Sequence, residues 1–435
     1  MKQAGITLVT RAFLLVITFA FNIIIARYLK AEGVGIVGTL MTFAGIGVQF
    51  GNLGLAVGAI YFIGLDKKRS GEIAGTLFTM GLLLSVIVFA IFIATASITP
   101  AILGNIDFNL YKIALISIAP LILALFFQNI LLVYQKITQY NVIELAVRAV
   151  SLVSTIAVFI FVDKSDWIIA TVWVFIGTAL AMGIANIIAV WKISPFKFVF
   201  SWNAFRDMIG YGWKSYYGML MMFLIIRSDI IFLNVFRSEA ETGIYRQVVY
   251  VSDLVYLIPM TLGTLLFPKL MQAGASAEIG EDDRARFTML ISRLVALFLF
   301  VFILLFALIG KWFLGIFGPE FPDGYYPLMI LLVGILFLGI ESILAAELAR
   351  RGLPIFVVIY STICVTVKIA GNFILVPQYG MYGAAWSSLA THLIFLAMVL
   401  WFCVKYYGFR VSDTLFVKSS DFKMIRERIK SMLNG

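Results

Sequence analysis

Residues 26–37 read ARYLKAEGVGIV, and residues 235–245 read VFRSEAETGIY. Both stretches contain the end of an apolar helix, a short turn with an acidic residue, a glycine and the start of a new apolar helix. Gly35 and Gly243 hold corresponding places in them. A motif that recurs in this way predicts an internal repeat, in which two halves of the chain fold alike.

The composition of the chain predicts an integral membrane protein. Apolar residues make up 62% of it and charged residues 13%, well below the charged share of a soluble domain. The net charge of +10 follows the membrane topology and does not indicate binding to nucleic acid. Cys364 and Cys403 both lie in apolar stretches, so no disulfide framework is expected.

The apolar stretches are long enough to cross a bilayer as helices, which takes about 20 residues each. The sequence predicts an all-α polytopic membrane protein, with twelve transmembrane helices in two six-helix lobes related by a parallel repeat. A shorter match between residues 171–173 and 384–386 agrees with this repeat. The predicted spans are residues 6–28, 35–64, 72–97, 110–134, 140–162, 167–191, 207–236, 241–268, 287–310, 326–349, 354–376 and 381–405.

The chain divides accordingly into four parts. Residues 1–191 form the predicted N-terminal lobe, residues 207–405 form the C-terminal lobe, and residues 192–206 are the cytoplasmic linker between them. Residues 406–435 carry apolar side chains at helical spacing among Lys and Arg residues. This pattern predicts a basic amphipathic helix on the anionic cytoplasmic leaflet, and the alternative is a solvated tail.

The loop charges indicate the orientation, because Lys and Arg are concentrated in cytoplasmic loops. If both termini are cytoplasmic, the cytoplasmic segments carry most of the Lys and Arg residues. The chain is therefore predicted to lie in the cytoplasmic, or inner, membrane with both termini inside. The opposite loops then carry only Arg27, Lys30, Lys112, Lys164, Arg237 and Lys311.

Charged side chains within the predicted spans are the candidate functional residues. A cation in hydrocarbon is costly, so it normally faces protein, water or a ligand. Cations outnumber acids in these spans, which indicates a polar cavity that receives an anionic substrate. Arg293 is set apart because it lies near a cytoplasmic helix end and can extend to the interface. The predicted substrate-binding cations are Arg11, Arg148, Lys214, Arg227, Arg246 and Lys368.

Two of these cations belong to polar stripes along a helix face. A stripe of this kind fits the wall of a cavity. The alternative is hydrogen bonding between helices, which stabilises membrane bundles. The two stripes have the same spacing, in Arg11, Thr18 and Asn22 and again in Ser361, Lys368 and Asn372.

The acids within the spans have two interpretations. Asp229, Asp253 and Glu341 are candidates for coupling transport to H⁺ or Na⁺. The alternative is that they neutralise nearby cations. Glu144 and Arg148 stand four residues apart in the favoured order, and we expect them to pair with each other.

Catalytic and metal-binding patterns are absent from the sequence. His392 is the only histidine, it is expected to be packed and hydrogen-bonded, and the two cysteines do not add metal-ligand spacing. There is no Walker loop, and no predicted loop is long enough to hold a catalytic domain. The chain is therefore predicted not to be an enzyme, and no cofactor is expected beyond a coupling H⁺ or Na⁺.

Three stretches carry a resemblance to a known family. They are residues 26–40, the run from Asp229 through residues 240–245 to residues 267–270, and residues 379–385. In these the chain resembles polysaccharide exporters of the multidrug/oligosaccharidyl-lipid/polysaccharide superfamily. The resemblance implies two lobes in a V, alternating access and flipping of polyprenyl-diphosphate-linked oligosaccharides. The lipid II flippase branch usually has two further C-terminal helices, and the multidrug branch usually has fewer cations in its cavity.

The resemblance implies a flippase for repeat units of O-antigen or capsule type. The cations agree, since a diphosphate needs compensating charge in a low-dielectric region. The expected partners are lipid-diphosphate-linked oligosaccharide, membrane lipids and enzymes of polysaccharide synthesis. One alternative is a cation-coupled multidrug exporter that depends on Asp229 and Asp253. The other is a membrane polymerase or ligase, which would be expected to have a sizeable outer loop.

Overall fold

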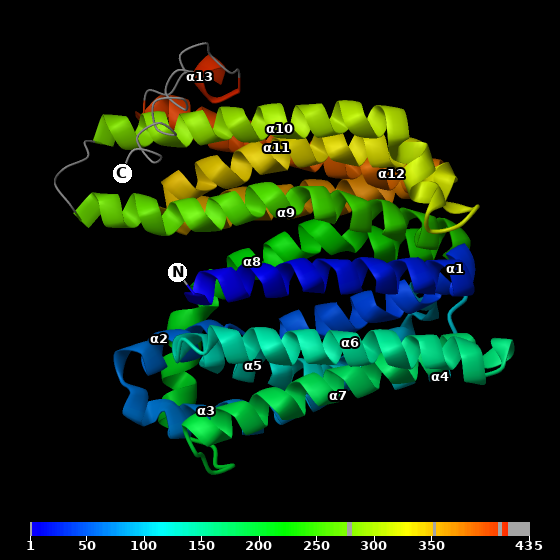
Figure 1. The fold of residues 1–435 in the computed structure, drawn as a ribbon, viewed down its shortest axis with the longest axis horizontal. Coiled ribbons are helices and arrows are strands. Elements are labelled where there is room, and N and C mark those ends of the chain that lie inside the picture. Colours follow the sequence, from blue (N-terminus) through cyan, green and yellow to red (C-terminus); the bar gives the residue numbers. More distant parts are fainter. Residues whose placement is uncertain (1, 276–280, 351–353, 408–410, 416–435) are drawn as a thin grey trace. The chain divides into compact units, whose positions relative to one another are not determined.

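The structure is a computed structural model that describes residues 2–275, 281–350, 354–407 and 411–415. In these ranges every regular element is a helix and there is no strand, as the composition predicts (Figure 1). The 3₁₀ turns are η1 (Lys67–Arg69), η2 (Pro100–Leu103), η3 (Lys164–Asp166) and η4 (Phe321–Gly324). The α-helices are α1 (Lys2–Asn52), α2 (Leu55–Leu65), α3 (Ser70–Ile98), α4 (Phe108–Leu115), α5 (Ile118–Val133), α6 (Ile137–Phe161), α7 (Trp167–Ile193), α8 (Trp202–Phe236), α9 (Glu239–Ala275), α10 (Glu281–Gly315), α11 (Tyr325–Arg350), α12 (Pro354–Tyr407) and α13 (Val411–Leu415).

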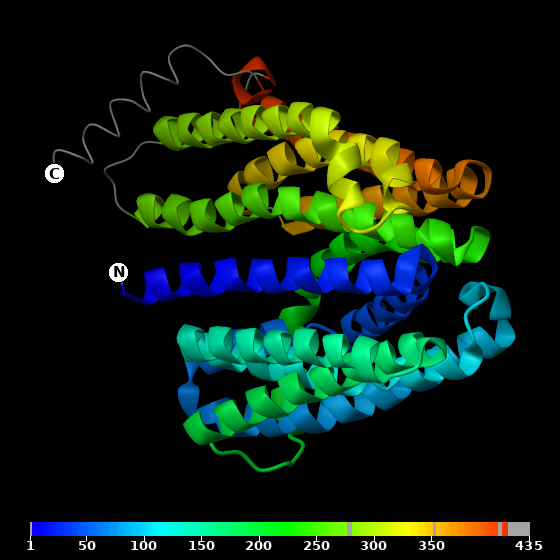
Figure 2. The ribbon, with the colours of Figure 1, turned by 45° about the vertical axis from the view of Figure 1, so that its right-hand side comes forward.

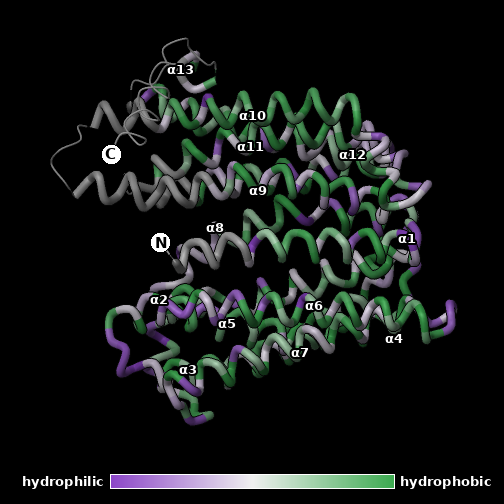
Figure 3. The backbone as a smooth tube through the Cα atoms, in the orientation of Figure 1, coloured by the Kyte–Doolittle hydropathy of each residue, from purple (hydrophilic) through white to green (hydrophobic). Residues whose placement is uncertain are grey.

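The helices have the length and apolar character of membrane spans. Within the described ranges, nine helices are long and apolar enough to cross a membrane. Hydrophilic residues gather at turns, such as the one between α2 and α3, whereas the middles of the helices are mainly apolar (Figure 3). The chain is therefore a multi-pass membrane protein. The predicted amphipathic tail falls mainly on residues 416–435, outside the part that the structure describes.

Two of the longest helices are interrupted by a residue with positive φ. In α1 this residue is Lys30, with a φ of 56°, and in α12 it is Gly380, also with a φ of 56°. Glycine adopts such a conformation freely, whereas a lysine does so only at a cost. At Lys30 the turn is stabilised by Glu320, whose Oε2 accepts a hydrogen bond of 2.7 Å from the backbone N–H of Ala31.

Contacts between helices divide the chain into two compact units. Unit 1 comprises Met1–Arg246 and Gly315–Phe321, and unit 2 comprises Gln247–Leu314 and Pro322–Gly435. Unit 1 therefore contains α8 and the start of α9 as well as the N-terminal helices. The two units are defined by contacts between helices. They are not the two lobes that the sequence repeat predicts, and those lobes stay a prediction.

Unit 1 is built on close helix pairs. Helix α6 runs beside α7, and α5 packs against α7 (Figures 1 and 2). Gly183 of α7 permits the second contact, because a Cβ there would lie 3.0 Å from the carbonyl oxygen of Pro120 in α5. Phe126 and Phe127 of α5 are fully buried; Phe126 lies against Gly81 of α3, and the ring of Phe127 packs with that of Phe196. Helix α6 contacts α1 as well as α7, so it lies between these two helices in the packing of unit 1.

The N-terminal part of α8 packs along α2, from Gly54 at its start to Arg69 in the turn η1 that follows it. The Nη2 of Arg69 lies 2.7 Å from Oδ2 of Asp207, and the rings of Tyr61 and Tyr211 stack with their centroids 3.8 Å apart. At Gly212, an added Cβ would lie 2.0 Å from the carbonyl oxygen of Gly54. We call these contacts the cytoplasmic latch, after the predicted orientation of the chain; its residues are Gly54, Tyr61, Arg69, Asp207, Tyr211 and Gly212.

The segment that joins α7 to α8 lies on α3. The backbone N–H of Ser201 donates a 3.1 Å hydrogen bond to Oγ1 of Thr76, and the hydroxyl of Ser201 donates to the carboxylate of Glu72. The carbonyl oxygen of Lys197 lies so close to Gly75 that a Cβ there would approach it to 2.2 Å. The predicted linker is thus attached along α3 rather than free of it.

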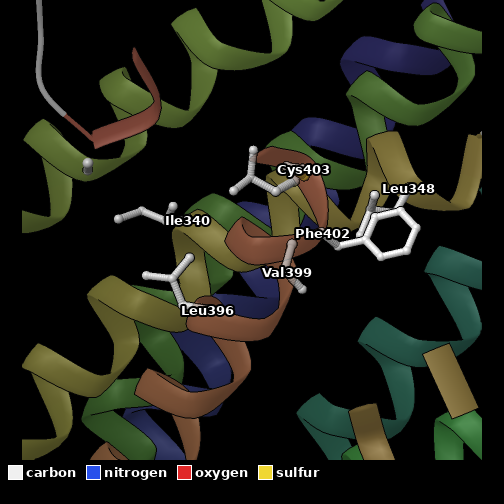
Figure 4. Packing of buried hydrophobic residues seen from close by; sticks show 8 residues of the cluster. Ile340, Leu348, Leu396, Val399, Phe402 and Cys403 are labelled. Atoms are coloured by element: carbon white, nitrogen blue, oxygen red, sulfur yellow. The ribbon is translucent and has the colours of Figure 1, made fainter. Parts of the chain in front are cut away.

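Unit 2 has its own apolar core, mainly between α11 and α12. The side chains of Ile340 and Leu344 on α11 pack with Val399, Phe402 and Cys403 on α12 (Figure 4). All are buried, and Cys403 is a free thiol. This core holds the C-terminal helices together independently of the polar residues described next.

Candidate functional site

Arg11 on α1 faces α6. Its Nη1 lies 3.4 Å from Oε2 of Glu144, and its Cζ lies 5.6 Å from the centre of the Tyr140 ring. The Arg11 side chain is 49% exposed, and that of Glu144 is 21% exposed. A long and open ion pair of this kind holds its cation weakly. The Arg11 guanidinium is therefore available to an anion that competes with Glu144.

Arg148 lies one helical turn beyond Glu144 on α6, and its side chain is exposed. The expected pair of Glu144 with Arg148 is not among the ion pairs of the described residues, since Glu144 contacts Arg11 instead. An i, i+4 pair contributes only about 0.2–0.5 kcal/mol, so a partner on a neighbouring helix easily replaces it. Lys214 on α8 is also exposed.

Arg246 on α9 lies against α1. A Cβ added at Gly38 would lie 2.3 Å from Cδ and 2.5 Å from Nη1 of Arg246. Its Nη2 is 3.5 Å from the Met41 sulfur. Gly38 therefore makes room for the guanidinium at this helix contact. Arg227 on α8 is half-buried.

Asp229 on α8 is almost fully buried, at 3% exposed. The hydroxyl of Tyr245 on α9 donates a 2.7 Å hydrogen bond to its Oδ2. Tyr245 is itself completely buried, two residues after Gly243. This bond ties α8 to the start of α9. Asp253, farther along α9, is half-buried.

Lys368 lies inside unit 2 and is only 1% exposed. Its ammonium donates a hydrogen bond to the hydroxyl of Ser388, and the hydroxyl of Ser387 donates a 3.1 Å bond to the carbonyl oxygen of Lys368. These bonds join the two segments of α12 on either side of Gly380. In this structure the Lys368 ammonium is therefore enclosed by protein.

Other charged and polar groups are also buried in unit 2. Glu341 on α11 lies near Tyr256, Tyr360 and Cys364, and Arg293 on α10 is buried as well. Within the described residues, no cluster of three His, Cys, Asp or Glu side chains is placed to hold a metal ion.

The comparison with protein families decides which family the chain represents. The sequence pattern of the polysaccharide biosynthesis protein family matches residues 2–274. The chain belongs to this family. The match includes α1 to α8 and nearly all of α9, so it contains every residue of the Arg11, Arg246 and Asp229 contacts. No curated protein sequence matches the chain.

Solved structures of known transporters have the same fold. The chain is similar to the lipid II flippase MurJ in its inward closed conformation, with a TM-score of 0.71 and 16% identity over 94% of this chain and 88% of that one. It is also similar to an inward-facing multidrug resistance MATE family transporter of the MOP superfamily, with a TM-score of 0.67 and 13% identity over 91% of this chain and 95% of that one. The two structures show that the fold expected from the resemblance is correct, and they are a flippase and a transporter.

Several residues of the candidate site were not predicted from the sequence. Tyr140, Tyr245 and Ser388 contact predicted charged residues, and each is an uncharged side chain in an apolar span. Tyr140 stands one turn before Glu144 on the same helix, which is a signal that could have identified it. Tyr245 and Ser388 become visible only when neighbouring helices are placed together.

Proposed function

We propose that this protein is a flippase that carries polyprenyl-diphosphate-linked oligosaccharide repeat units, of O-antigen or capsule type, across the cytoplasmic membrane by alternating access. Membership of the polysaccharide biosynthesis family is the observation that carries the proposal. The loop charges support an inner-membrane location with both termini in the cytoplasm. Enzymes that make or polymerise the lipid-linked glycan are its proposed partners.

We also propose twelve spans in two repeated lobes. The interruptions at Lys30 and Gly380 divide α1 and α12 into two spans each. Helix α2 then continues the second span, and α4 and α5 together form another. This interpretation of the helices agrees in number with the twelve apolar stretches of the sequence.

Arg11 and Arg148 are the proposed contacts for the diphosphate in the first half. Both guanidinium groups are exposed, and they lie on the adjoining helices α1 and α6. Arginine suits a diphosphate because its planar fork binds two phosphate oxygens at once. Lys214, Arg227, Arg246 and Lys368 complete the proposed set of cations. Lys368 can join it only in a conformation that exposes its ammonium.

A transport assay tests this function directly. The protein is reconstituted in proteoliposomes with a fluorescent polyprenyl-diphosphate oligosaccharide, and the fraction of lipid that crosses the bilayer is measured over time. Arg11→Gln and Arg148→Gln are each expected to slow transport roughly tenfold, the size expected when a charge-assisted hydrogen bond is lost. Lys164→Gln removes an exposed cation from the α6–α7 turn and is the matched control.

Full transport by both arginine variants would contradict the proposed diphosphate contacts. An absence of transport by the unmodified protein, with a drug substrate carried instead, would favour the second function, a cation-coupled multidrug exporter. The buried Asp229 with its Tyr245 hydrogen bond is the observation in favour of that alternative, because H⁺ or Na⁺ coupling needs a carboxylate shielded from lipid. Asp229→Asn would then abolish drug transport, while Arg11→Gln would be mild.

A further inference from the structure

The two glycines of the repeated motif pack directly against each other. A Cβ added at Gly35 would lie 1.9 Å from the carbonyl oxygen of Glu239, and one added at Gly243 would lie 1.8 Å from the carbonyl oxygen of Ala31. The relation is reciprocal, because each added Cβ would also come within about 3 Å of the other glycine's backbone nitrogen, at 3.0 and 2.8 Å. Equivalent residues of the two halves thus face each other, as at a twofold axis.

Two loops flank this crossing in equivalent ways. The carbonyl oxygen of Ile316, in the loop after α10, accepts a 2.9 Å hydrogen bond from Nε of Arg27. The carbonyl oxygen of Ile102, in the turn after α3, accepts a 3.4 Å hydrogen bond from Nδ2 of Asn234. Arg27 and Asn234 both stand just before the turn that leads to the crossing glycine.

The two loops also match in their local sequence. In each, the accepting carbonyl is followed by a buried apolar residue, Leu103 or Phe317, and then by a glycine with positive φ. Those glycines are Gly104, with a φ of 59°, and Gly318, with a φ of 145°. Each half of the chain therefore reaches across to the other half with the same structural element.

One contact breaks this symmetry. Glu320 of the second half accepts the N–H of Ala31, at the start of the helical segment that follows Lys30. The corresponding start of α9 is capped from within, since the hydroxyl of Ser238 accepts the N–H of Glu241. The first half thus depends on the second for its helix cap, whereas the second half supplies its own.

We infer that these contacts form a closure on the non-cytoplasmic side of the membrane that must open before a substrate can leave. We call it the outer clasp, and its residues are Arg27, Ala31, Gly35, Ile102, Asn234, Gly243, Ile316 and Glu320. The inference rests on the alternating access of the proposed function, but on no particular substrate. All of its residues lie in unit 1.

The chemistry of the outer clasp suits a reversible closure. At the crossing, backbone meets backbone, so separation of the two helices does not require large side chains to disengage. The surrounding bonds run from side chains to backbone carbonyls or to one N–H, and water can replace each partner when the closure opens. Nothing larger than hydrogen fits at Gly35 or Gly243, so a single methyl group is enough to hold the helices apart.

External thiol labelling tests the outer clasp without any transported substrate. The full chain carries Cys364→Ser and Cys403→Ser, and Met41→Cys serves as the reporter because Met41 lies beyond the crossing against Arg246. A membrane-impermeant maleimide is added to right-side-out vesicles. Gly35→Ala and Gly243→Ala are expected to increase external labelling at least fivefold. Gly177→Ala is the matched control, because no atom lies within 4 Å of a Cβ there, and it should leave labelling unchanged.

Glu320→Gln is less disruptive to folding than the glycine variants. It weakens only the hydrogen bond from the N–H of Ala31, so external labelling should increase about twofold. If folded protein with either glycine replaced labels no faster than the control, and Glu320→Gln also has no effect, the outer clasp is not the barrier. This outcome would not bear on which substrate the protein transports. Conversely, increased labelling in a protein that moves no lipid-linked sugar would support the clasp and refute the proposed function.

Discussion

The outer clasp and the cytoplasmic latch fasten the two halves of the chain in different ways. The outer clasp is reciprocal, and its central contact joins backbone to backbone at distances that exclude even a methyl group. The cytoplasmic latch has a glycine contact too, but it adds an exposed ion pair and a stack of two tyrosines. The central contact of the outer clasp is therefore set by shape, whereas the strength of the cytoplasmic latch depends partly on charge and on salt.

The difference is informative about what each side must do. An exposed ion pair contributes at most about 1 kcal/mol and is screened at physiological ionic strength, so its contribution changes with the solution. A backbone crossing does not respond to salt or to pH. We therefore expect salt to leave the glycine crossing of the outer clasp unchanged and to weaken the ion pair of the cytoplasmic latch.

The largest effect is expected when the outer crossing is overfilled. Gly243→Ala should destabilise the protein by about 3 kcal/mol or more, the upper end of the cost of overpacking, because its Cβ would approach the carbonyl oxygen of Ala31 to 1.8 Å. A thermal unfolding curve in detergent should shift down by several degrees. Gly210→Ala on α8 meets no atom within 4 Å and should not lower the midpoint. Equal midpoints for the two variants would show that the crossing is not tightly packed.

A smaller effect is expected from Tyr245→Phe, next to the same crossing. This change removes the 2.7 Å hydrogen bond to the buried Asp229, and a lost partner of a buried carboxylate costs about 1–3 kcal/mol at most. The melting midpoint should fall, and Asp229→Asn in the same chain should recover part of the loss. Tyr326→Phe alters an exposed tyrosine and is the control. No recovery in the double variant would mean that the tyrosine acts through packing alone.

The smallest effect is expected at the cytoplasmic latch. A double-mutant cycle with Arg69→Gln and Asp207→Asn should give a coupling free energy of about 0.2–1 kcal/mol at low salt, since both side chains are partly exposed. The coupling should shrink as sodium chloride is raised, whereas the effect of Gly243→Ala should not change. If the coupling between Arg69 and Asp207 persists at high salt, the cytoplasmic latch does not differ from the outer clasp in its response to salt.

Much of the fold could be predicted from the sequence. Long apolar stretches allow only helices in a membrane, because each backbone polar group must find its partner within the segment. The repeated glycines also marked the site of the outer crossing, although not that the two glycines meet. The flanking contacts of Ile102 and Ile316 could not be predicted. Their acceptors are backbone carbonyl oxygens, which every residue has whatever its side chain.

The candidate site was harder to predict for a different reason. Spacing along one helix suggested that Glu144 would pair with Arg148, but the adjoining helix α1 supplies Arg11 instead. Lys368 was expected at a cavity, yet in this structure it is buried and its ammonium donates to the hydroxyl of Ser388 in its own unit. In both cases the partner of the charged residue depends on how helical segments pack together, and spacing along a single helix does not determine this.

The cap that Glu320 places on Ala31 has a consequence for the synthesis of the chain. The two residues are 289 positions apart, so the turn at Lys30 emerges from the ribosome long before its cap exists. At about 5–20 residues per second, the interval is roughly 15–60 s. During this time Glu320 cannot accept the N–H of Ala31, so this N–H bonds to water and nothing from the second half stabilises the turn at Lys30. The first half therefore reaches its final folded structure only after the ribosome has translated more than half of the second.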